Sequence, residues 1–311
     1  MCIFFLVRYI IIKQKGLFQI HPLASFAPTS KSSTPLQYYY ELTPNTQAYD
    51  HASWLTQDVV YHYNADGLHE RFDYPVQKDA HVYRIITLGD SFTFGMWVNT
   101  EANFSELLED ALNTTASCPG IDRFEVINLG VPGYDLHYAF QRFEDKGSKY
   151  APDAVIWFLR GENFILHTEL YRDLEETYKK TLKEKTVETS DQSDMYAAST
   201  LAYQAYMDAY ATYSAEKQEQ IKQEELKNIT ALSKRYSIPI VLVTLEEESE
   251  ENKKSMQQLA LRGKNIWYDA VVGADTFHPN DYHLNAPGHT RIAQTVFTFL
   301  LSHFLQSCRM Q

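Results

Sequence analysis

The sequence is poor in cysteine, poor in basic residues and without a long hydrophobic run. Its three cysteines, at positions 2, 118 and 308, show no short metal-ligand spacing, so the sequence predicts neither a zinc site nor a disulfide framework. Cys118 and Cys308 can pair in an oxidising compartment or stay as separate buried thiols, and both interpretations are open at this point.

Basic residues are outnumbered by acidic ones. The chain has 28 Lys and Arg against 40 Asp and Glu, a formal net charge of -12 at pH 7, and its basic residues form no visible cluster. An acidic protein repels phosphate-rich partners unless basic side chains gather on one surface. We therefore expect no nucleic-acid partner.

The apolar stretch near the N-terminus, CIFFLVRYIII, is too short for a membrane span. A spanning helix needs about 18 or more apolar residues, and Arg8 interrupts this stretch. It is also a poor signal peptide, because Lys13 and Lys15 follow the apolar residues instead of preceding them. Membrane association stays open, and an extracytoplasmic or membrane-associated location is favoured over the cytoplasm.

Two parts of the chain differ in residue composition and hydrophobic pattern. With 44% hydrophobic residues the chain can bury a sizeable core. Residues 1–80 contain the short apolar segment, a linker rich in Ser, Thr and Pro, and then recurrent aromatic residues. We interpret them as an N-terminal extension that packs on a main domain formed by residues 81–308.

Short apolar runs alternate with helical patterns along the main domain. Buried strands are expected at 82–89, 124–130, 153–161, 238–245 and 265–271. Helices are expected at 100–113 with Thr100 as a candidate N-cap, at 134–150, along one long stretch through Tyr206 to Tyr236, and at 286–305 with Pro287 near its start. The alternation predicts an α/β fold, a three-layer α/β/α sandwich with a mainly parallel central sheet in a flavodoxin-like arrangement.

A charged segment at about 165–199 interrupts this alternation. It is rich in Lys and Glu, which predicts a helical excursion with a solvated face. A lid over a substrate site is the alternative interpretation.

Ser91 follows the first expected strand in the motif LGDSFTFG. Open α/β sheets place their sites at the carboxyl ends of the strands, so this serine is expected to face the crevice there. A serine hydroxyl is a poor nucleophile at neutral pH and needs a base that a third group orients. Ser91 is therefore a candidate nucleophile, provided that the chain supplies those two groups.

A histidine and an acid lie together in FHPNDYHLNAPGH, just before the last expected helix. Asp281 and His283 are two residues apart, so in an extended or turn segment the carboxylate can bond one ring nitrogen and leave the other for Ser91. His278 and His289 compete for the role of base. We favour His283 because of its paired acid, and we expect a capping or packing role for His289 at the start of the helix.

Acyl transfer also needs donors aimed at the developing oxyanion, each worth about 3 kcal/mol of barrier. Gly130 ends the second expected strand in INLGVPGYD and can offer its backbone N–H at close range. Asn163 ends the third in FLRGENF and can offer its side-chain amide. Three strands thus bring polar residues to one edge of the sheet.

These residues, in this order, resemble the SGNH hydrolase superfamily of GDSL-like esterases and lipases. The matching blocks are Ser91 in GDSFTFG, Gly130 in NLGVPG, Asn163 in GEN and His283 in DYHLN, and the resemblance covers about three quarters of the chain. It implies Ser91 as nucleophile, His283 as base and Asp281 as the orienting acid. It also implies an oxyanion hole formed by the Ser91 and Gly130 amides with Asn163, and no metal or organic cofactor.

Two positions depart from the family pattern. Phe164 follows Asn163 where many members have Asp, which changes what anchors the amide donor. Asn280 stands three residues before His283, where many members have the acid, whereas Asp281 matches members with D-x-H spacing. Asp281 is therefore our interpretation of the acid, with its neighbour as the position to compare.

The resemblance implies a serine ester hydrolase that acts on a small acyl ester or an acylated glycan, such as an O-acetylated polysaccharide. The aromatic-rich flank fits sugar stacking, although most of its tyrosines fit packing better. Two alternatives stay open, because a fold does not fix a function. One is an O-acyltransferase acting on a polysaccharide, and the other is a catalytically silent binding protein that keeps the fold.

Overall fold

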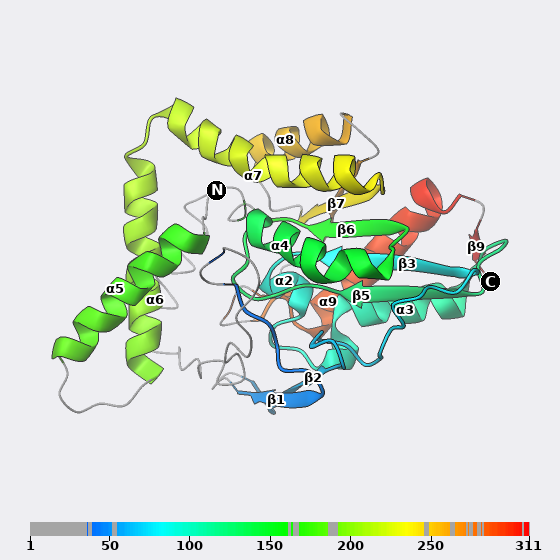
Figure 1. The fold of residues 1–311 in the computed structure, drawn as a ribbon, viewed down its shortest axis with the longest axis horizontal. Helices are drawn as coiled ribbons and strands as arrows, with labels where there is room; N and C mark the ends of the chain where they lie inside the picture. Colours follow the sequence, from blue (N-terminus) through cyan, green and yellow to red (C-terminus); the bar gives the residue numbers. More distant parts are fainter. Residues whose placement is uncertain are drawn as a thin grey trace.

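A computed structural model shows five parallel strands at the centre of the chain, with helices on both faces (Figure 1). The structure describes residues 36, 39–51, 55–160, 163, 168–185, 192–245, 249–261, 265–271, 273, 276–278, 281, 283–306 and 308–310. The sheet has the order β5-β3-β6-β7-β8. Its strands are β3 (Val82–Leu88), β5 (Arg123–Asn128), β6 (Ala154–Phe158), β7 (Ile240–Leu245) and β8 (Ile266–Ala270). The expected α/β/α class with a parallel sheet is confirmed.

The strands are apolar on both faces because both faces are covered. In β3, Ile85 belongs to the core on one side of the sheet and Ile86 to the core on the other, and both are fully buried. β3 is hydrogen-bonded to β5 and β6 on its two sides. The strand that leads to Ser91 is therefore packed on both faces and hydrogen-bonded along both edges.

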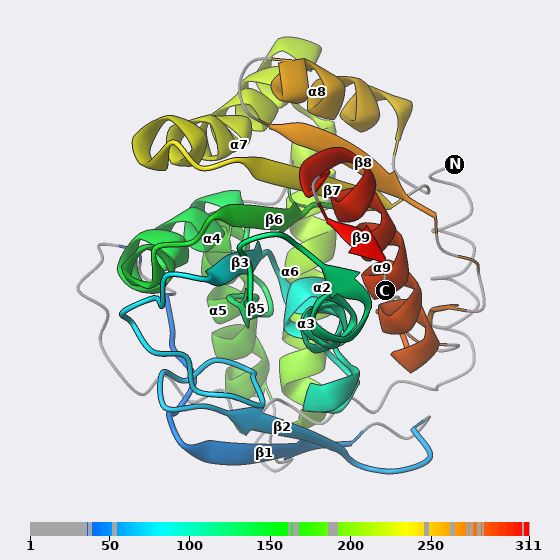
Figure 2. The ribbon, with the colours of Figure 1, turned by 90° about the vertical axis from the view of Figure 1, so that its right-hand side faces the viewer.

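Two groups of helices complete the sandwich, one on each side of the sheet (Figure 2). One face is covered by α3 (Phe104–Thr115) and α9 (Ala286–Phe299). The other face is covered by α4 (Leu136–Arg142), α7 (Ala215–Tyr236) and α8 (Glu250–Leu261). α4 continues into a π-helical turn (Phe143–Gly147) and a 3-10 turn (Ser148–Tyr150).

Two helix boundaries differ from the sequence-based expectation. Thr100 does not cap α3, because Thr100–Ala102 forms a 3-10 turn and the Asn103 side chain accepts the N–H groups of Ser105 and Glu106. The single long helical stretch through Tyr206 to Tyr236 is two helices, α6 (Gln192–Ala211) and α7. The two helices are separate because Ser214 is the N-cap of α7: its side chain accepts the Lys217 N–H.

The N-terminal segment contributes an antiparallel hairpin, β1 (Thr46–Asp50) and β2 (Val59–Tyr63), which the sequence did not predict. Tyr61 and Tyr63 are buried in one cluster with Phe94 and Trp97 of the main domain. Much of the aromatic-rich flank is therefore packing, as expected. Residues 1–35, with the apolar stretch and most of the linker, lie outside the described residues, and the division at residue 80 stays a prediction.

The charged excursion forms a pair of helices, α5 (Thr168–Lys185) and α6, which pack on each other. The pair stands beyond the carboxyl edge of the sheet, at the left in Figure 1 and behind the sheet in Figure 2. Its first residue is anchored to the main domain, since the Thr168 N–H donates to Asp135 Oδ2 at 2.7 Å. Across the described residues, no helix combines the length and apolar character that a bilayer crossing requires.

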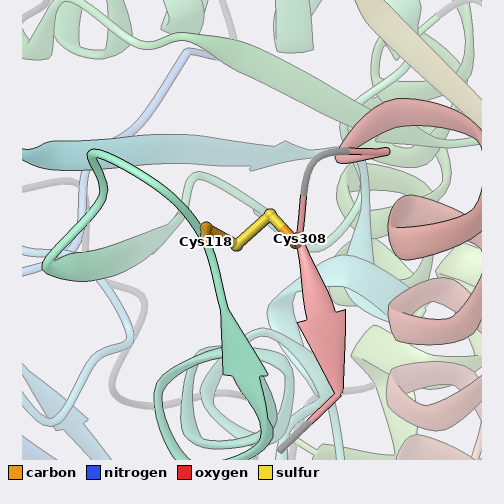
Figure 3. The surroundings of a disulfide bond; sticks show 2 residues. All are labelled: Cys118 and Cys308. Atoms are coloured by element: carbon orange, nitrogen blue, oxygen red, sulfur yellow. A yellow bond between two sulfur atoms is a disulfide. The ribbon is translucent and has the colours of Figure 1, made fainter.

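The C-terminal end is joined to the main domain by a disulfide between Cys118 and Cys308 (Figure 3). The bond lies beside a small antiparallel pair, β4 (Ala116–Ser117) with β9 (Arg309–Met310), which follows α9 and a π-helical turn (Leu300–Phe304). Of the two interpretations left open by the sequence, the structure has the paired cysteines.

Candidate active site

Ser91 lies at the carboxyl edge of the sheet, three residues beyond Leu88, the last residue of β3. It is the first residue of α2 (Ser91–Phe94), a helix of a single turn whose N-cap is Asp90. The Asp90 Oδ1 atom accepts the Phe92 N–H at 2.9 Å. Within the described residues, no acceptor lies in hydrogen-bond range of the Ser91 N–H. Its hydroxyl and N–H are thus presented together at the N-terminus of a helix.

His283 and Asp281 complete a chain of hydrogen bonds with Ser91. The His283 Nε2 atom lies 2.8 Å from Ser91 Oγ, and its Nδ1 atom lies 2.5 Å from Asp281 Oδ1. A carboxylate only accepts, so the proton of the neutral ring sits on Nδ1 and Nε2 is left to accept from the serine hydroxyl. All three residues are buried, with exposed fractions of 9% or less.

The Asp281 carboxyl is held in its ionised form. Burial alone would raise its pKa, but attraction to the His283 ring when that ring is protonated, together with hydrogen bonds from the His283 ring and backbone, lowers the pKa below its usual value overall. The His283 backbone N–H donates to the same Oδ1 atom at 2.7 Å. The acid is therefore a fixed acceptor that sets the tautomer and the orientation of the imidazole.

The segment that carries Asp281 and His283 is stabilised by its own backbone hydrogen bonds before α9 begins. The His278 N–H donates to the His283 carbonyl at 3.0 Å, and the Asn285 N–H donates to the Thr276 carbonyl at 2.9 Å. Asn285 then caps α9 through its side chain. On its other side the His283 ring packs on Phe92, with ring centroids 4.9 Å apart.

The two competing histidines have other positions. His289 is buried in α9, and its Nδ1 atom accepts the Phe104 N–H at 3.1 Å at the start of α3. Burial lowers the pKa of His289 to about 3, which fits this role as a neutral acceptor. Burial also lowers the pKa of His278 to about 4. Among the described residues, the Ser91 hydroxyl is hydrogen-bonded to His283 and to neither of these rings. Asn280, the position to compare with Asp281, lies outside the described residues.

Asn163 has a side chain whose orientation is fixed from both ends. Its Oδ1 atom accepts the Arg160 N–H at 2.7 Å, and its Nδ2 atom donates to Asp90 Oδ2 at 3.1 Å. Since an N–H must face oxygen and a carboxylate must face nitrogen, the amide has one possible orientation. One Nδ2 hydrogen remains after the bond to Asp90. Asp90 thus connects the amide to the helix of Ser91, while Phe164 lies outside the described residues.

Gly130 differs in part from the expectation. A Cβ atom at this position would lie 2.2 Å from the Phe94 nitrogen, so only glycine allows the end of β5 to approach α2 this closely. Its N–H, which we expected to be an oxyanion donor, donates to Asn128 Oδ1 at 2.9 Å. Gly130 is thus needed for close packing, and its N–H would have to be shared to serve an oxyanion as well.

Three residues that hold the parts of the site in place were missed in the sequence: Asp90, Asn128 and His69. The first two stand inside the GDS and NLG motifs, where a polar residue at the end of an apolar strand is a usable signal. His69 lies in the N-terminal segment, and nothing in its local sequence points to its partner, the Phe94 carbonyl at the end of α2.

Comparison with known protein families gives one match. Residues 85–296 match the sequence model of a family described as GDSL-like Lipase/Acylhydrolase. No curated protein sequence matches the chain significantly.

Three solved structures resemble the chain at low identity. They are an acetyl xylan esterase, AlAXEase (17% identity, TM-score 0.39, 70% of this chain and 99% of that chain), the psychrotrophic esterase EstA from Pseudoalteromonas sp. (14%, 0.42, 70% and 98%), and an acetyl xylan esterase from the rumen bacterium Butyrivibrio proteoclasticus (14%, 0.41, 71% and 64%).

Proposed function

The chain belongs to the GDSL-like lipase and acylhydrolase family, a family of ester hydrolases, and from this premise we propose that Ser91, His283 and Asp281 are its catalytic triad. One observation carries the proposal. The His283 ring bridges Ser91 Oγ at 2.8 Å and Asp281 Oδ1 at 2.5 Å, although the serine lies 192 residues away in the sequence. A nucleophile, a base and an orienting acid in one line is the arrangement that acyl transfer needs.

In the proposed reaction, Ser91 Oγ attacks the ester carbonyl carbon while its proton passes to His283 Nε2. The C–O bond to the alcohol then breaks, and the imidazolium returns the proton to the departing alkoxide. Water repeats the sequence on the acyl-enzyme, giving up one proton to His283 and releasing the carboxylic acid and Ser91. The Asp281 carboxylate stays ionised throughout and stabilises the imidazolium.

The negative charge on the carbonyl oxygen needs preorganised donors. The Ser91 N–H at the start of α2 and the remaining Nδ2 hydrogen of Asn163 are the two that we assign. Gly130 is a third donor when its N–H is shared between the oxyanion and Asn128 Oδ1. This assignment deepens the sequence-based one, because it gives Asn163 a fixed orientation and makes Gly130 the weaker of the three.

A small acyl group, such as acetyl, is the proposed acid component of the ester. Support comes from the burial of the triad, since Ser91 is 9% exposed and His283 is 4% exposed. A long acyl chain would need an open apolar path to the serine.

A sugar hydroxyl of an acylated glycan is the proposed alcohol component. The N-terminal tyrosines no longer support it, because they are packing residues. Its support is the position of α6 beyond the carboxyl edge of the sheet (Figure 1), with partly buried Tyr203 and Tyr210 along it. Rings of this kind combine an apolar face with a polar tip.

An extracytoplasmic location is part of the proposal. The bond between Cys118 and Cys308 supports it, because disulfides persist in oxidising compartments and are rare in the cytosol. The net negative charge and the apolar stretch near the N-terminus are compatible with more than one compartment, so the proposal rests on the disulfide.

The experiment that tests the triad is hydrolysis of p-nitrophenyl acetate by the full chain. Ser91→Ala should abolish turnover, while Ser148→Ala, a serine in a turn after α4, serves as the matched control and should leave it unchanged. Equal rates for the chain and its Ser91→Ala variant would remove the hydrolase proposal and favour a silent binding protein.

The acid is tested by a second pair of variants. Asp281→Asn should lower kcat by about 10⁴-fold, as loss of the orienting acid does in other serine hydrolases. Asn280→Ala should change it much less, and the reverse order would assign the orientation of the His283 ring to Asn280 instead of Asp281.

Hydrolysis and acyl transfer are separated by the fate of the acyl group. With an acetylated glycan as donor, we expect free acetate whether or not a second glycan is added. Acetate recovered mainly on the added glycan would instead identify an O-acyltransferase.

A further inference from the structure

The helix that carries Ser91 is too short to be stable by itself. α2 has four residues, and isolated helical turns are unstable because the first turn fixes many dihedral angles for one hydrogen bond. Its first carbonyls are used internally, since the Phe94 N–H donates to Asp90 O and the Gly95 N–H donates to Ser91 O. The carbonyls at its C-terminal end need partners from outside the helix.

Two side chains supply those partners. The Asn128 Nδ2 atom, at the end of β5, donates to Thr93 O at 3.0 Å and makes a longer bond to Phe94 O at 3.4 Å. The His69 Nδ1 atom, from the N-terminal segment, donates to Phe94 O at 2.7 Å. The next residue of that segment, Glu70, accepts the Asn128 N–H. Of these two consecutive residues, His69 supports α2 directly, and Glu70 holds Asn128, which is the other support.

The His69 ring is locked in the state that this role needs. A carbonyl only accepts, so Nδ1 carries the proton, and Nε2 accepts from the Thr100 hydroxyl at 2.8 Å. Burial lowers the pKa of His69 to about 3, so the ring stays neutral. It packs on Phe94 with ring centroids 4.5 Å apart and edge-on against Tyr61 at 5.0 Å. Both its contacts and its hydrogen bonds fix its position.

We propose that His69 is a positioning residue for the nucleophile: by donating to the last carbonyl of α2, it holds this turn, and hence Ser91 Oγ, at the distance from His283 Nε2 that proton transfer requires. The inference rests on the proposed function for its catalytic part. A shift of about 1 Å in such a contact can lower a rate by about 10²-fold. His69 touches neither His283 nor Asp281, so it acts only through the helix.

Two substitutions separate the hydrogen bond from the packing. His69→Phe keeps an aromatic ring of similar size and loses the donor, whereas His69→Asn loses the ring and keeps a donor near the position of Nδ1. His62→Phe is the matched control, because this ring on β2 bonds Gln47 at the surface and does not reach α2. Thermal unfolding identifies the temperature at which all three variants are folded.

Two measurements follow at that temperature. In hydrogen exchange, amides in a peptide spanning residues 88–96 should exchange faster in His69→Phe than in the wild type, with His69→Asn between them. With p-nitrophenyl acetate, His69→Phe should lose at least about tenfold in kcat with KM changed by less than about twofold, and His69→Asn should lose less. His62→Phe should match the wild type in both.

The outcomes are distinct. If His69→Asn is as impaired as His69→Phe or more so, packing and not the donated hydrogen bond is what matters, and the inference is wrong. Unchanged exchange in His69→Phe also overturns it, whatever the chain hydrolyses. If the wild type itself has no Ser91-dependent turnover, the proposed function falls, together with the catalytic part of the inference, and the exchange result still decides whether His69 holds the helix.

Discussion

Removal of the disulfide gives the most quantitative test of the fold. Cys118 lies before the first residue of β5, at the amino edge of the sheet, and Cys308 follows the last helix (Figure 3). The strand pair beside the bond, β4 with β9, has only two residues in each strand. So few backbone hydrogen bonds cannot hold the C-terminal end by themselves, and the covalent bond is expected to do most of this work.

The magnitude follows from the length of chain that the bond closes. The two cysteines are 190 residues apart, and the loop-entropy relation gives a stabilisation of about 5 kcal/mol at 25 °C for a loop of that length. This is an upper figure, because residual structure in the unfolded chain reduces the entropy that the bond removes. It is comparable to the whole net stability of many domains, about 5–15 kcal/mol.

The assay is urea unfolding, followed by circular dichroism, of the wild type and of a Cys118→Ser/Cys308→Ser double variant. We expect the free energy of unfolding to fall by several kcal/mol in the variant and in the reduced wild type, with no further effect of reductant on the variant. A loss below about 1 kcal/mol would refute the loop-closure reasoning.

Activity provides the second arm of the same test. Ser91 lies at the carboxyl edge of the sheet and the disulfide at the opposite edge, so the folded double variant should hydrolyse p-nitrophenyl acetate as the wild type does at 25 °C. Lost turnover in a folded variant would contradict the independence of the two ends.

Three further predictions concern single residues. Gly130→Ala should displace α2, because the new Cβ would lie 2.2 Å from the Phe94 nitrogen, and turnover should fall more than the melting temperature indicates; normal kcat would contradict this. Asn163→Ala should lower kcat by about 10²–10³-fold with KM little changed, as expected for an oxyanion donor, and a change confined to KM would assign it to substrate binding. Burial raises the pKa of Glu109 from 4.5 to about 7, so the folded chain keeps a proton that the unfolded chain loses, and stability falls as the pH rises between these values. Glu109→Gln, which keeps an acceptor for the Val126 N–H, should reduce the fall in the free energy of unfolding between pH 5 and pH 8, measured by urea unfolding. An unchanged fall would assign it to the other buried carboxyls with a raised pKa, such as Asp50 and Glu225.

The parts of the site that the sequence could predict are those with a local signal. Ser91 follows an apolar strand within three residues, and Asp281 lies two residues from His283, so the spacing alone places a carboxylate beside an imidazole. These relations depend on strand geometry over a few residues. The hydrogen bonds of the proposed triad were therefore predictable in kind. Ser91 and His283 are 192 residues apart in the sequence, and it is the parallel sheet that brings them together.

The parts that could not be predicted depend on contacts between distant segments. Gly130 reads as a turn residue in the sequence, and only the closeness of Phe94 explains why a side chain is excluded. His69 has no local pattern of its own, because its partners are a carbonyl and a hydroxyl that belong to other segments. Backbone carbonyls are the same in every sequence, so the need of a short helix for outside donors is invisible until the fold is known.

Side chains from α3 and from the N-terminal segment close an exposed edge of the sheet. β5 is an edge strand, and its outward N–H groups would be open to pairing with another chain. Side chains close this edge at alternate residues: Asn113 accepts the Phe124 N–H at 2.9 Å, Glu109 accepts the Val126 N–H at 2.6 Å, and Glu70 accepts the Asn128 N–H.

Two of these caps come from α3, within the predicted main domain, but the third comes from the predicted extension. Glu70 closes the end of β5 nearest the site, and its neighbour His69 supports the helix of Ser91. A chain cut at residue 80 would expose that end of the edge strand and remove the bond that His69 donates to α2. For this reason we infer that His69 and Glu70 belong to the structure that supports Ser91, whereas the division at residue 80 stays a prediction.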